Sequence, residues 1–231
     1  QREQIKEAMQ LPGIIVKGIM THFPSADESS PQTTHRQTQL FNQALEDLQP
    51  ANDVIIHTAN SAAGVRFPQS HFGMVRFGLI TYGLVPSPYV QMPDGIQPVM
   101  AWHTQIVEIR DIPSGSSIGY GMTYRTQKPS RIATLPLGYA DAYLRAFSNR
   151  AQVLVLGKRC PVVGRVSMNI TTVDITHLPQ VTIGDEAVLI GKQENERILA
   201  EELAAWADTI NYEIVCLAGK MNKKSEMNKK D

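Results

Sequence analysis

Short apolar runs alternate with amphipathic stretches over the first 90 residues. Residues 14–20 (IIVKGIM), 53–57 (DVIIH) and 74–82 (MVRFGLITY) are apolar and rich in β-branched side chains, which is typical of strands. Residues 39–48 repeat apolar side chains at helical spacing, and the polar start of the chain also has a helical pattern. The segment before the third run is long enough for one or two helical turns. Strands separated by helices predict βαβ units and a parallel sheet.

The pattern changes near residue 90, where four closely spaced prolines prevent a continuous element. We place a domain boundary there and predict a mostly antiparallel β domain over residues 91–219. A helix at 198–207 and a short strand at 212–216 are expected to close this domain. The end of the chain, 220–231, has five lysines and no apolar face, which predicts disorder. The expected strands of the β domain cover residues 101–112, 131–139, 152–156, 162–175 and 186–190.

Composition and charge narrow the possible classes of function. The 231 residues are 42% hydrophobic, and 22 basic residues balance 22 acidic ones. A net charge of zero gives no field to attract nucleic acid or anionic lipid, and no run reaches the roughly 18 apolar residues of a membrane span. Cys160 and Cys216 stand singly, without metal-ligand spacing, and are typical of buried free thiols in a reducing compartment. We therefore expect a cytoplasmic protein without a metal, whose partners are small molecules or other protein chains.

Polar side chains follow the apolar runs of the first half, although Walker A, HExxH and GxSxG motifs are absent from the sequence. His22 follows the first run, Asn60 and Ser61 follow the second, and Arg76 interrupts the third. In parallel α/β folds, side chains at the carboxyl ends of strands face the ligand site. His22 and Ser61 singly have ordinary explanations as a rim histidine and a helix cap. Arg76 is harder to explain, because a buried guanidinium needs an acceptor or a ligand.

Taken together and in order, seven segments between residues 11 and 216 closely resemble alanine racemases. These are fold-type III enzymes that use pyridoxal 5′-phosphate (PLP) and consist of a (β/α)8 barrel followed by a β domain. The resemblance implies an α/β plus β fold, in which residues 1–90 are the last strands of a barrel and residues 91–219 are the β domain. The segments are THFPSADE (21–28), HTANSAA (57–63), MVRFGLITYGL (74–84), GYGMTYR (119–125), LGYADAYLR (137–145), VGRVSMN (163–169) and INYEI (210–214).

The resemblance also implies a role for individual residues. His22 would lie against the pyridine ring of PLP, and Arg76 would donate a hydrogen bond to the ring nitrogen. A dianionic phosphate needs several donors with fixed geometry. The implied donors are the hydroxyls of Ser61 and Tyr212 and the backbone N–H groups of Gly78 and Leu79.

The same resemblance implies racemisation of L- and D-alanine by two bases, which supplies D-alanine for peptidoglycan. Tyr120 would be one base, reaching the barrel of a partner subunit, so the active sites of a homodimer would be shared. His22, hydrogen-bonded to Arg76, would assist Tyr120. Met168 would lie beside the substrate carboxylate, and Tyr139 would line the access channel together with Asp141 and Arg165.

Two family features are missing from this sequence. The family binds PLP through a lysine in a motif like VKANAYGHG, and it contacts the substrate carboxylate through an arginine in a motif like GMxRxG; neither motif occurs here. We therefore expect a fragment that is inactive alone. Two alternatives stay open: a serine or broad-specificity amino-acid racemase, and a non-catalytic remnant that binds no cofactor.

Overall fold

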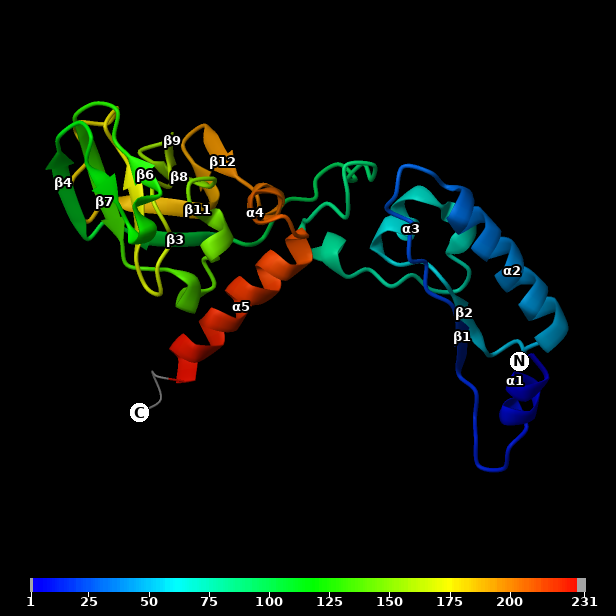
Figure 1. Ribbon diagram of the computed structural model, residues 1–231. Coiled ribbons are helices and arrows are strands. Elements are labelled where there is room, and N and C mark those ends of the chain that lie inside the picture. Colours follow the sequence, from blue (N-terminus) through cyan, green and yellow to red (C-terminus); the bar gives the residue numbers. More distant parts are fainter. Residues whose placement is uncertain (1, 228–231) are drawn as a thin grey trace. The chain divides into compact units, whose positions relative to one another are not determined.

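The computed structural model describes residues 2–227 and divides the chain into two compact units (Figure 1). The first unit is Gln1–Pro98 and the second is Val99–Asp231. The boundary between the units therefore lies at the last of the closely spaced prolines rather than near residue 90. No helix among the described residues is long and apolar enough to cross a membrane.

The first unit combines a short parallel sheet with helices. Strand β1 (Gly18–Met20) pairs in parallel with β2 (Ile55–His57), with Met20 opposite His57. This pairing confirms the parallel arrangement that the sequence predicts. The helix that joins the two strands begins after Pro31 and is longer than expected. The helical elements of this unit are α1 (Arg2–Met9), α2 (Gln32–Leu48), α3 (Ser61–Arg66), η1 (Pro68–Ser70) and η2 (Leu79–Tyr82).

The third strand expected in this unit, at residues 74–82, is wrong. The segment instead runs beside the end of β2 and the residues that follow it, where the Gly73 N–H donates to the Ile56 carbonyl and the Arg76 N–H donates to the Ala59 carbonyl, both at 2.9 Å. Two such bonds hold the segment but form no ladder. Its apolar residues then enter the core from the single turn of η2, where Leu79 and Ile80 are buried.

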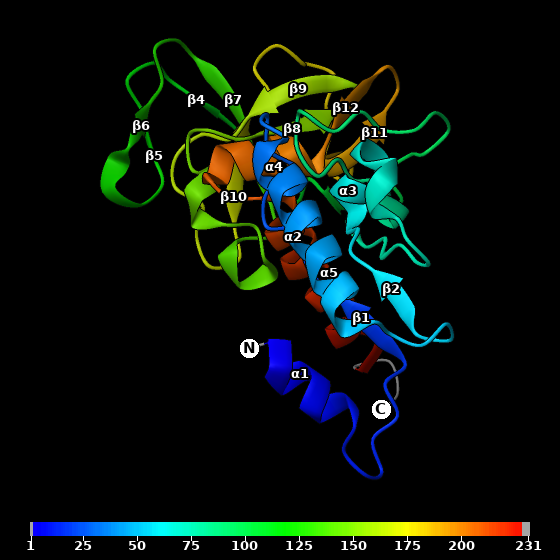
Figure 2. The ribbon, with the colours of Figure 1, turned by 90° about the vertical axis from the view of Figure 1, so that its right-hand side faces the viewer.

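The second unit is built from antiparallel pairs, as predicted. One sheet has the order β10-β7-β4, and a larger one has the order β12-β11-β8-β9, with β3 also paired to β11 (Figure 1). The β5–β6 hairpin stands out from the edge of these sheets (Figure 2). The strands are β3 (Trp102–Gln105), β4 (Glu108–Ile112), β5 (Ser117–Ile118), β6 (Tyr124–Arg125), β7 (Ser130–Leu135), β8 (Gln152–Val155), β9 (Lys158–Pro161), β10 (Thr171–Asp174), β11 (Glu186–Gln193) and β12 (Glu196–Ile198).

The helices of the second unit correct the prediction for the end of the chain. Helix α4 (Ala200–Ala207) lies where a helix was expected, but the predicted strand at 212–216 is wrong, because α5 (Asn211–Met227) replaces it. Ile214 and Ala218 are both buried, one helical turn apart, so this segment buries a helical face. The helix also includes the first part of the tail that was expected to be disordered. Residues 228–231 of that tail lie outside the described residues.

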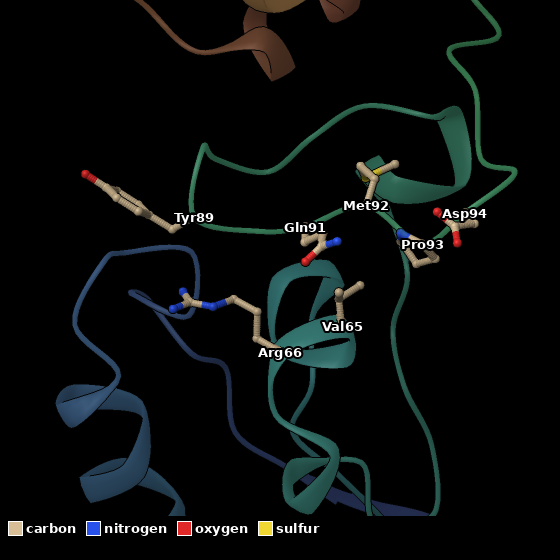
Figure 3. Close-up of a pocket in the computed structure, with 7 residues that line it drawn as sticks. All are labelled: Val65, Arg66, Tyr89, Gln91, Met92, Pro93 and Asp94. Carbon is tan, nitrogen blue, oxygen red and sulfur yellow. The ribbon is translucent and has the colours of Figure 1, made fainter.

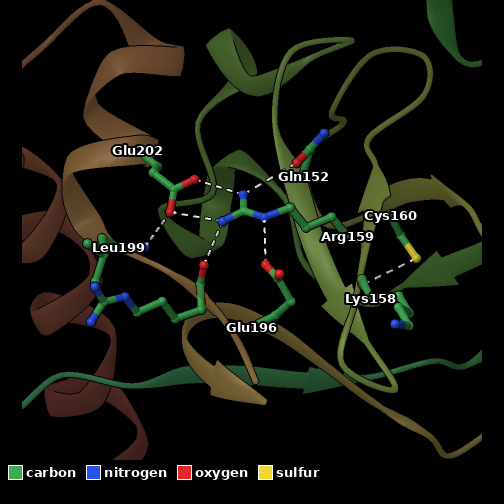
Figure 4. A network of polar contacts seen from close by, with 8 residues as sticks. Gln152, Lys158, Arg159, Cys160, Glu196, Leu199 and Glu202 are labelled. Carbon is green, nitrogen blue, oxygen red and sulfur yellow. Dashed lines mark hydrogen bonds and ion pairs between the residues drawn. The ribbon is translucent and has the colours of Figure 1, made fainter. Parts of the chain in front are cut away.

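A polar network around Arg159 joins three elements of this unit (Figure 4). From β9, the Arg159 guanidinium binds the Glu202 carboxylate of α4 at 2.7 Å and the Glu196 carboxylate of β12 at 3.1 Å. It also donates to the Arg197 carbonyl at 2.6 Å. Glu202 in turn accepts the Leu199 N–H at 3.1 Å, which satisfies a donor at the start of α4. The network therefore fixes the helix and the edge strand against β9.

The two cysteines differ in exposure, so the expectation of two buried thiols holds for only one of them. Both are free, but Cys160 is buried and Cys216 is exposed. Burial, and secondarily the charge of Asp174, raises the pKa of the Cys160 thiol to about 12. The thiolate is the reactive form, so both the burial of Cys160 and its protonation make it unreactive toward alkylating reagents.

We therefore expect iodoacetamide at pH 8 to alkylate Cys216 quickly and Cys160 only after the protein is unfolded. Peptide mass mapping of the folded protein would give modification at Cys216 alone. As a control, Cys216→Ser should leave the folded protein unmodified, while denaturant should restore labelling at Cys160. Rapid labelling of Cys160 in the folded protein would contradict this assignment.

Candidate functional site

Arg76 connects the carboxyl ends of both strands of the first unit. Its Nη2 donates to the carbonyls of Thr21 and Thr58, each at 3.1 Å, and lies 3.2 Å from His22 Nδ1. Its Nη1 lies 2.6 Å from His57 Nδ1. The contact expected between His22 and Arg76 is therefore present. The Arg76 N–H donates to the Ala59 carbonyl, just after β2, and this bond holds the Arg76 backbone beside the strand ends.

The guanidinium determines how the two imidazoles are protonated. Arginine has only donors, so the Nδ1 atom of each ring must accept, and each neutral ring carries its proton on Nε2. Burial, and secondarily the charge of Arg76, lowers the pKa of His57 from its usual value. The arrangement therefore keeps His57 neutral and fixes the guanidinium from both sides.

Sequence reasoning missed the part that His57 plays. The residue belongs to the segment HTANSAA but was assigned no role. The available signal was its position at the end of an apolar run, in register with Met20 just before His22. His57 ends β2 and His22 lies just after β1. The two parallel strands therefore bring both histidines to the same edge, where both contact Arg76.

A second group of donors lies at the starts of α3 and η2. The Ser61 hydroxyl is buried and accepts the Gly78 N–H at 2.9 Å, so its own proton remains available for donation. Asn60 caps α3 by accepting the Ala63 N–H at 3.0 Å, and its amide donates to the Phe23 carbonyl at 3.1 Å. This second bond ties α3 to the segment that follows β1. Ser61 is therefore in contact with Gly78, which Leu79 follows directly, and in this structure the Gly78 N–H expected to bind a phosphate is bonded to Ser61.

In the second unit, Tyr120 occupies the short turn η3 (Tyr120–Met122), and 75% of its surface is exposed. Gly119 and Gly121 flank it with φ of +73° and +72°, a conformation that L side chains rarely adopt. A Cβ at Gly119 would also lie only 3.0 Å from the Arg165 backbone nitrogen. The glycines thus let the Tyr120 turn pack on the Arg165 loop. Together they line a hollow of about 360 Å³ with Ser167, Ile170 and Thr172.

Tyr139 and Met168 are held together by backbone contacts. The Tyr139 N–H donates to the Ser167 carbonyl at 3.0 Å, and the Ala140 N–H donates to the Met168 carbonyl at 2.8 Å. The Asp141 carboxylate accepts the Gly138 N–H at 3.0 Å and so fixes the start of the turn η4 (Tyr139–Asp141). Both side chains are exposed, Tyr139 by 47% and Met168 by 56%. The two predicted substrate residues are therefore neighbours on one surface.

The remaining predicted residue, Tyr212, is part of the second unit. It belongs to the first turn of α5 and is 39% exposed. A different hollow, of about 430 Å³, lies in the first unit between α3 and residues 89–94 (Figure 3). Arg66 points toward it but donates to the carbonyls of Ala26 and Glu28. None of its lining residues was predicted to take part in the site.

Comparison with known proteins gives one consistent result. The family model described as alanine racemase, N-terminal domain, matches residues 2–86, and that of the C-terminal domain matches residues 99–225. An alanine racemase of Syntrophobacter fumaroxidans is 44% identical over 96% of this chain and 59% of its own length. One of Halothermothrix orenii is 44% identical over 92% of this chain and 56% of its own length.

Solved structures agree with the sequence relatives. The alanine racemase of Bacillus anthracis with bound L-Ala-P is 36% identical with a TM-score of 0.85, covering 94% of this chain and 58% of its own. That of Bartonella henselae with covalently bound pyridoxal phosphate is 27% identical with a TM-score of 0.84, again over 94% and 58%. The chain thus spans less than two thirds of the length of these relatives. With both family models matched along almost its whole length, the chain belongs to the alanine racemase family.

Proposed function

We propose that these residues form most of the PLP pocket and supply one of the two bases of an enzyme that interconverts L- and D-alanine for peptidoglycan. The observation that carries the proposal is the position of Arg76, held at the strand ends by two imidazoles and two carbonyls. A surface arginine needs no such frame. The names of the relatives and the pyridoxal phosphate in the Bartonella henselae structure support the same conclusion.

The donor set fits PLP. A Cβ at Gly78 would meet only the Ser61 hydroxyl, at 3.9 Å, so the space beside these donors is open. The Ser61 hydroxyl and the first backbone N–H groups of η2, which have no partner within their own helix, are suited to a phosphate. We place the phosphate there, with the Tyr212 hydroxyl as a further donor. His22 would then lie against the face of the ring.

Arg76 determines which reaction is favoured. PLP, when bound, withdraws electrons from the Cα–H bond of the amino acid. Arg76 donates a hydrogen bond to the ring nitrogen but gives up no proton, because a guanidinium stays charged at any ordinary pH. A ring held by this donor would remain unprotonated and would be a weak electron acceptor, and this chemistry would favour racemisation over transamination.

Tyr120 supplies a proton donor and acceptor on one face of Cα. A phenol is a weak acid, so it serves readily as a proton donor and needs a partner to act as a base. His22 could give that help, because Arg76 fixes its proton on Nε2, from which it could donate toward the phenolate. Met168 would contact the substrate carboxylate, and Tyr139 would line the access to it. We propose a homodimer in which Tyr120 serves the partner's pocket, in a cytoplasmic enzyme.

The lysine of the second face is not found in a family-like motif within these 231 residues. We therefore assign the activity to the lysine-bearing enzyme, defined as a polypeptide that joins these residues to the lysine-bearing strands of the family's barrel. A serine or broad-specificity racemase is the second candidate, and assays with alanine, serine and larger amino acids would separate the two. If the lysine-bearing enzyme bound no PLP, the non-catalytic remnant would be the better explanation.

Arg76→Glu in the lysine-bearing enzyme tests the proposal. A carboxylic acid can share its proton with the ring nitrogen, so we expect racemisation to fall by about 100-fold and pyruvate formation to rise relative to it. The two rates are measured by chiral chromatography and by a coupled pyruvate assay. Arg36→Glu, on the exposed surface of α2, makes the same charge change and should alter neither rate. An unchanged ratio of the two activities in Arg76→Glu would sink this role.

A further inference from the structure

Two loops of the second unit each carry one residue of the proposed active site. Tyr120 lies in η3, which is closed by the Met122 N–H bonding to the Gly119 carbonyl at 3.2 Å and followed directly by Thr123. Met168 lies four positions after Gly164, in the loop that precedes β10. The distance between these loops sets how far the base stands from the substrate carboxylate. A group that fixes both loops would therefore control catalysis.

Asn149 contacts both loops through one amide group. Its Oδ1 accepts the Gly164 N–H at 2.6 Å, and its Nδ2 lies 3.1 Å from the Thr123 Oγ1. The backbone N–H of Gly164 can only donate, so the amide oxygen must face it and the nitrogen must face Thr123. Gly164 is buried, and this bond satisfies its N–H. The adjacent Ser148 hydroxyl accepts the Val166 N–H at 3.0 Å and strengthens the hold on the second loop.

The backbone at Asn149 has the conformation that this contact needs. Its φ is +57°, which asparagine tolerates better than most other residues. The left-handed conformation directs the amide between the loops, although the residue itself is exposed. A residue chosen only for a surface turn would need no acceptor aimed at a buried N–H. The Asn149 side chain therefore does more than allow the turn, because its amide also links two loops.

We propose that Asn149 is a positioning residue that fixes the Tyr120 loop against the Met168 loop. This inference rests on the proposed racemase activity. Asn149 touches neither substrate nor cofactor and acts through the loops it joins. Misplacing a reacting group by about 1 Å can lower a rate by about 100-fold. Releasing Tyr120 from Asn149 should therefore slow proton removal without preventing substrate binding.

Thr123→Val separates the two contacts, because it removes the link to the Tyr120 loop and keeps the bond to Gly164. In the lysine-bearing enzyme we expect kcat to fall about 10-fold with KM changed by less than about twofold. Asn149→Gly keeps the left-handed backbone and removes both links, so kcat should fall at least as far and KM should rise. Asn149→Asp should restore activity, since a carboxylate accepts from Gly164 and from the Thr123 hydroxyl.

A direct readout is exchange of the Cα proton with deuterated solvent, followed by NMR. Thr123→Val and Asn149→Gly should slow exchange from L-alanine, the substrate of Tyr120, and leave exchange from D-alanine nearly unchanged. Asp208→Gly is the matched control, because Asp208 is also exposed and left-handed in the same unit. If the unmodified enzyme exchanged neither isomer, the proposed function would fail. If it exchanged both and the variants behaved like it, or if Asn149→Asp gave no rescue, the positioning role alone would be overturned.

Discussion

Replacing Tyr120 with phenylalanine in the lysine-bearing enzyme is expected to stop removal of the Cα proton from L-alanine and to spare its removal from D-alanine. Phenylalanine keeps the ring and loses the hydroxyl, which is the only group of this side chain that can carry a proton. General acid–base catalysis contributes about 100- to 10,000-fold, so we expect a loss of about 1,000-fold for the L-isomer. The high exposure of Tyr120 in this chain leaves that hydroxyl accessible to another subunit.

The measurement must separate the two directions. Enantiomers have equal free energy, so the ratio of the two kcat/KM values stays at unity in any variant and reveals nothing about the bases. Exchange of the Cα proton into deuterated solvent reports each abstraction step by itself. Tyr89→Phe, at an exposed tyrosine of the first unit, is the control and should leave both exchange rates unchanged. Equal losses for the two isomers in Tyr120→Phe would refute the assignment of two bases.

Gly138→Ala is expected to lower the free energy of unfolding of the second unit substantially. A Cβ at this position would lie 2.1 Å from the Ser167 carbonyl oxygen and 2.7 Å from the Met168 carbonyl. These are backbone atoms, so no side chain can rotate away to make room. The turn η4 would have to move away from the Met168 loop. That movement would break the bonds from the Tyr139 N–H to the Ser167 carbonyl and from the Ala140 N–H to the Met168 carbonyl. Overpacking of this kind costs about 3 kcal/mol of the free energy of unfolding.

Both tryptophans, Trp102 and Trp206, lie in the second unit, so their fluorescence in urea reports the unfolding of that unit. The midpoint for Gly138→Ala should move to clearly lower urea. Gly219→Ala provides the control, because a Cβ there meets nothing within 4 Å and alanine favours the helix α5. It should unfold at the same or slightly higher urea. An unchanged midpoint for Gly138→Ala would contradict this prediction, because the turn η4 and the Met168 loop would then separate without any loss of stability.

Periodicity predicted the elements whose own side-chain pattern is regular, even where their partners lie far away in the sequence. The β1–β2 pair, the helix between them and the antiparallel second unit follow from alternation and helical spacing. The strand predicted at residues 212–216 was wrong because its β-branched residues favour a strand, while the burial of Ile214 and Ala218 depends on contacts that a local pattern does not reveal. The third strand failed for a similar reason, since a ladder needs a partner along its whole length.

The candidate site also has residues that the sequence predicted and residues that it did not. Arg76 could be singled out because a charge within an apolar run requires a partner, and the structure places His22 beside it. His57 was not predicted because its position at the end of an apolar run was given no weight, and Asn149 was not predicted because no sequence pattern shows which two loops its amide joins. Close approaches such as that of Gly138 to Ser167 also leave no local signal. The catalytic role of Tyr120, the contact of Met168 with the substrate and the contact of Tyr212 with the phosphate remain predictions.

The frame around Arg76 has a consequence for inorganic chemistry. Neutral imidazoles commonly bind zinc, nickel or copper through a nitrogen lone pair. Here both Nδ1 lone pairs are directed at a cation that does not dissociate, and both Nε2 atoms carry protons. The pair is therefore masked as a chelator. Loss of the guanidinium would free both lone pairs, so the side chain that we propose to contact the cofactor also occupies the bonding positions of the two imidazoles.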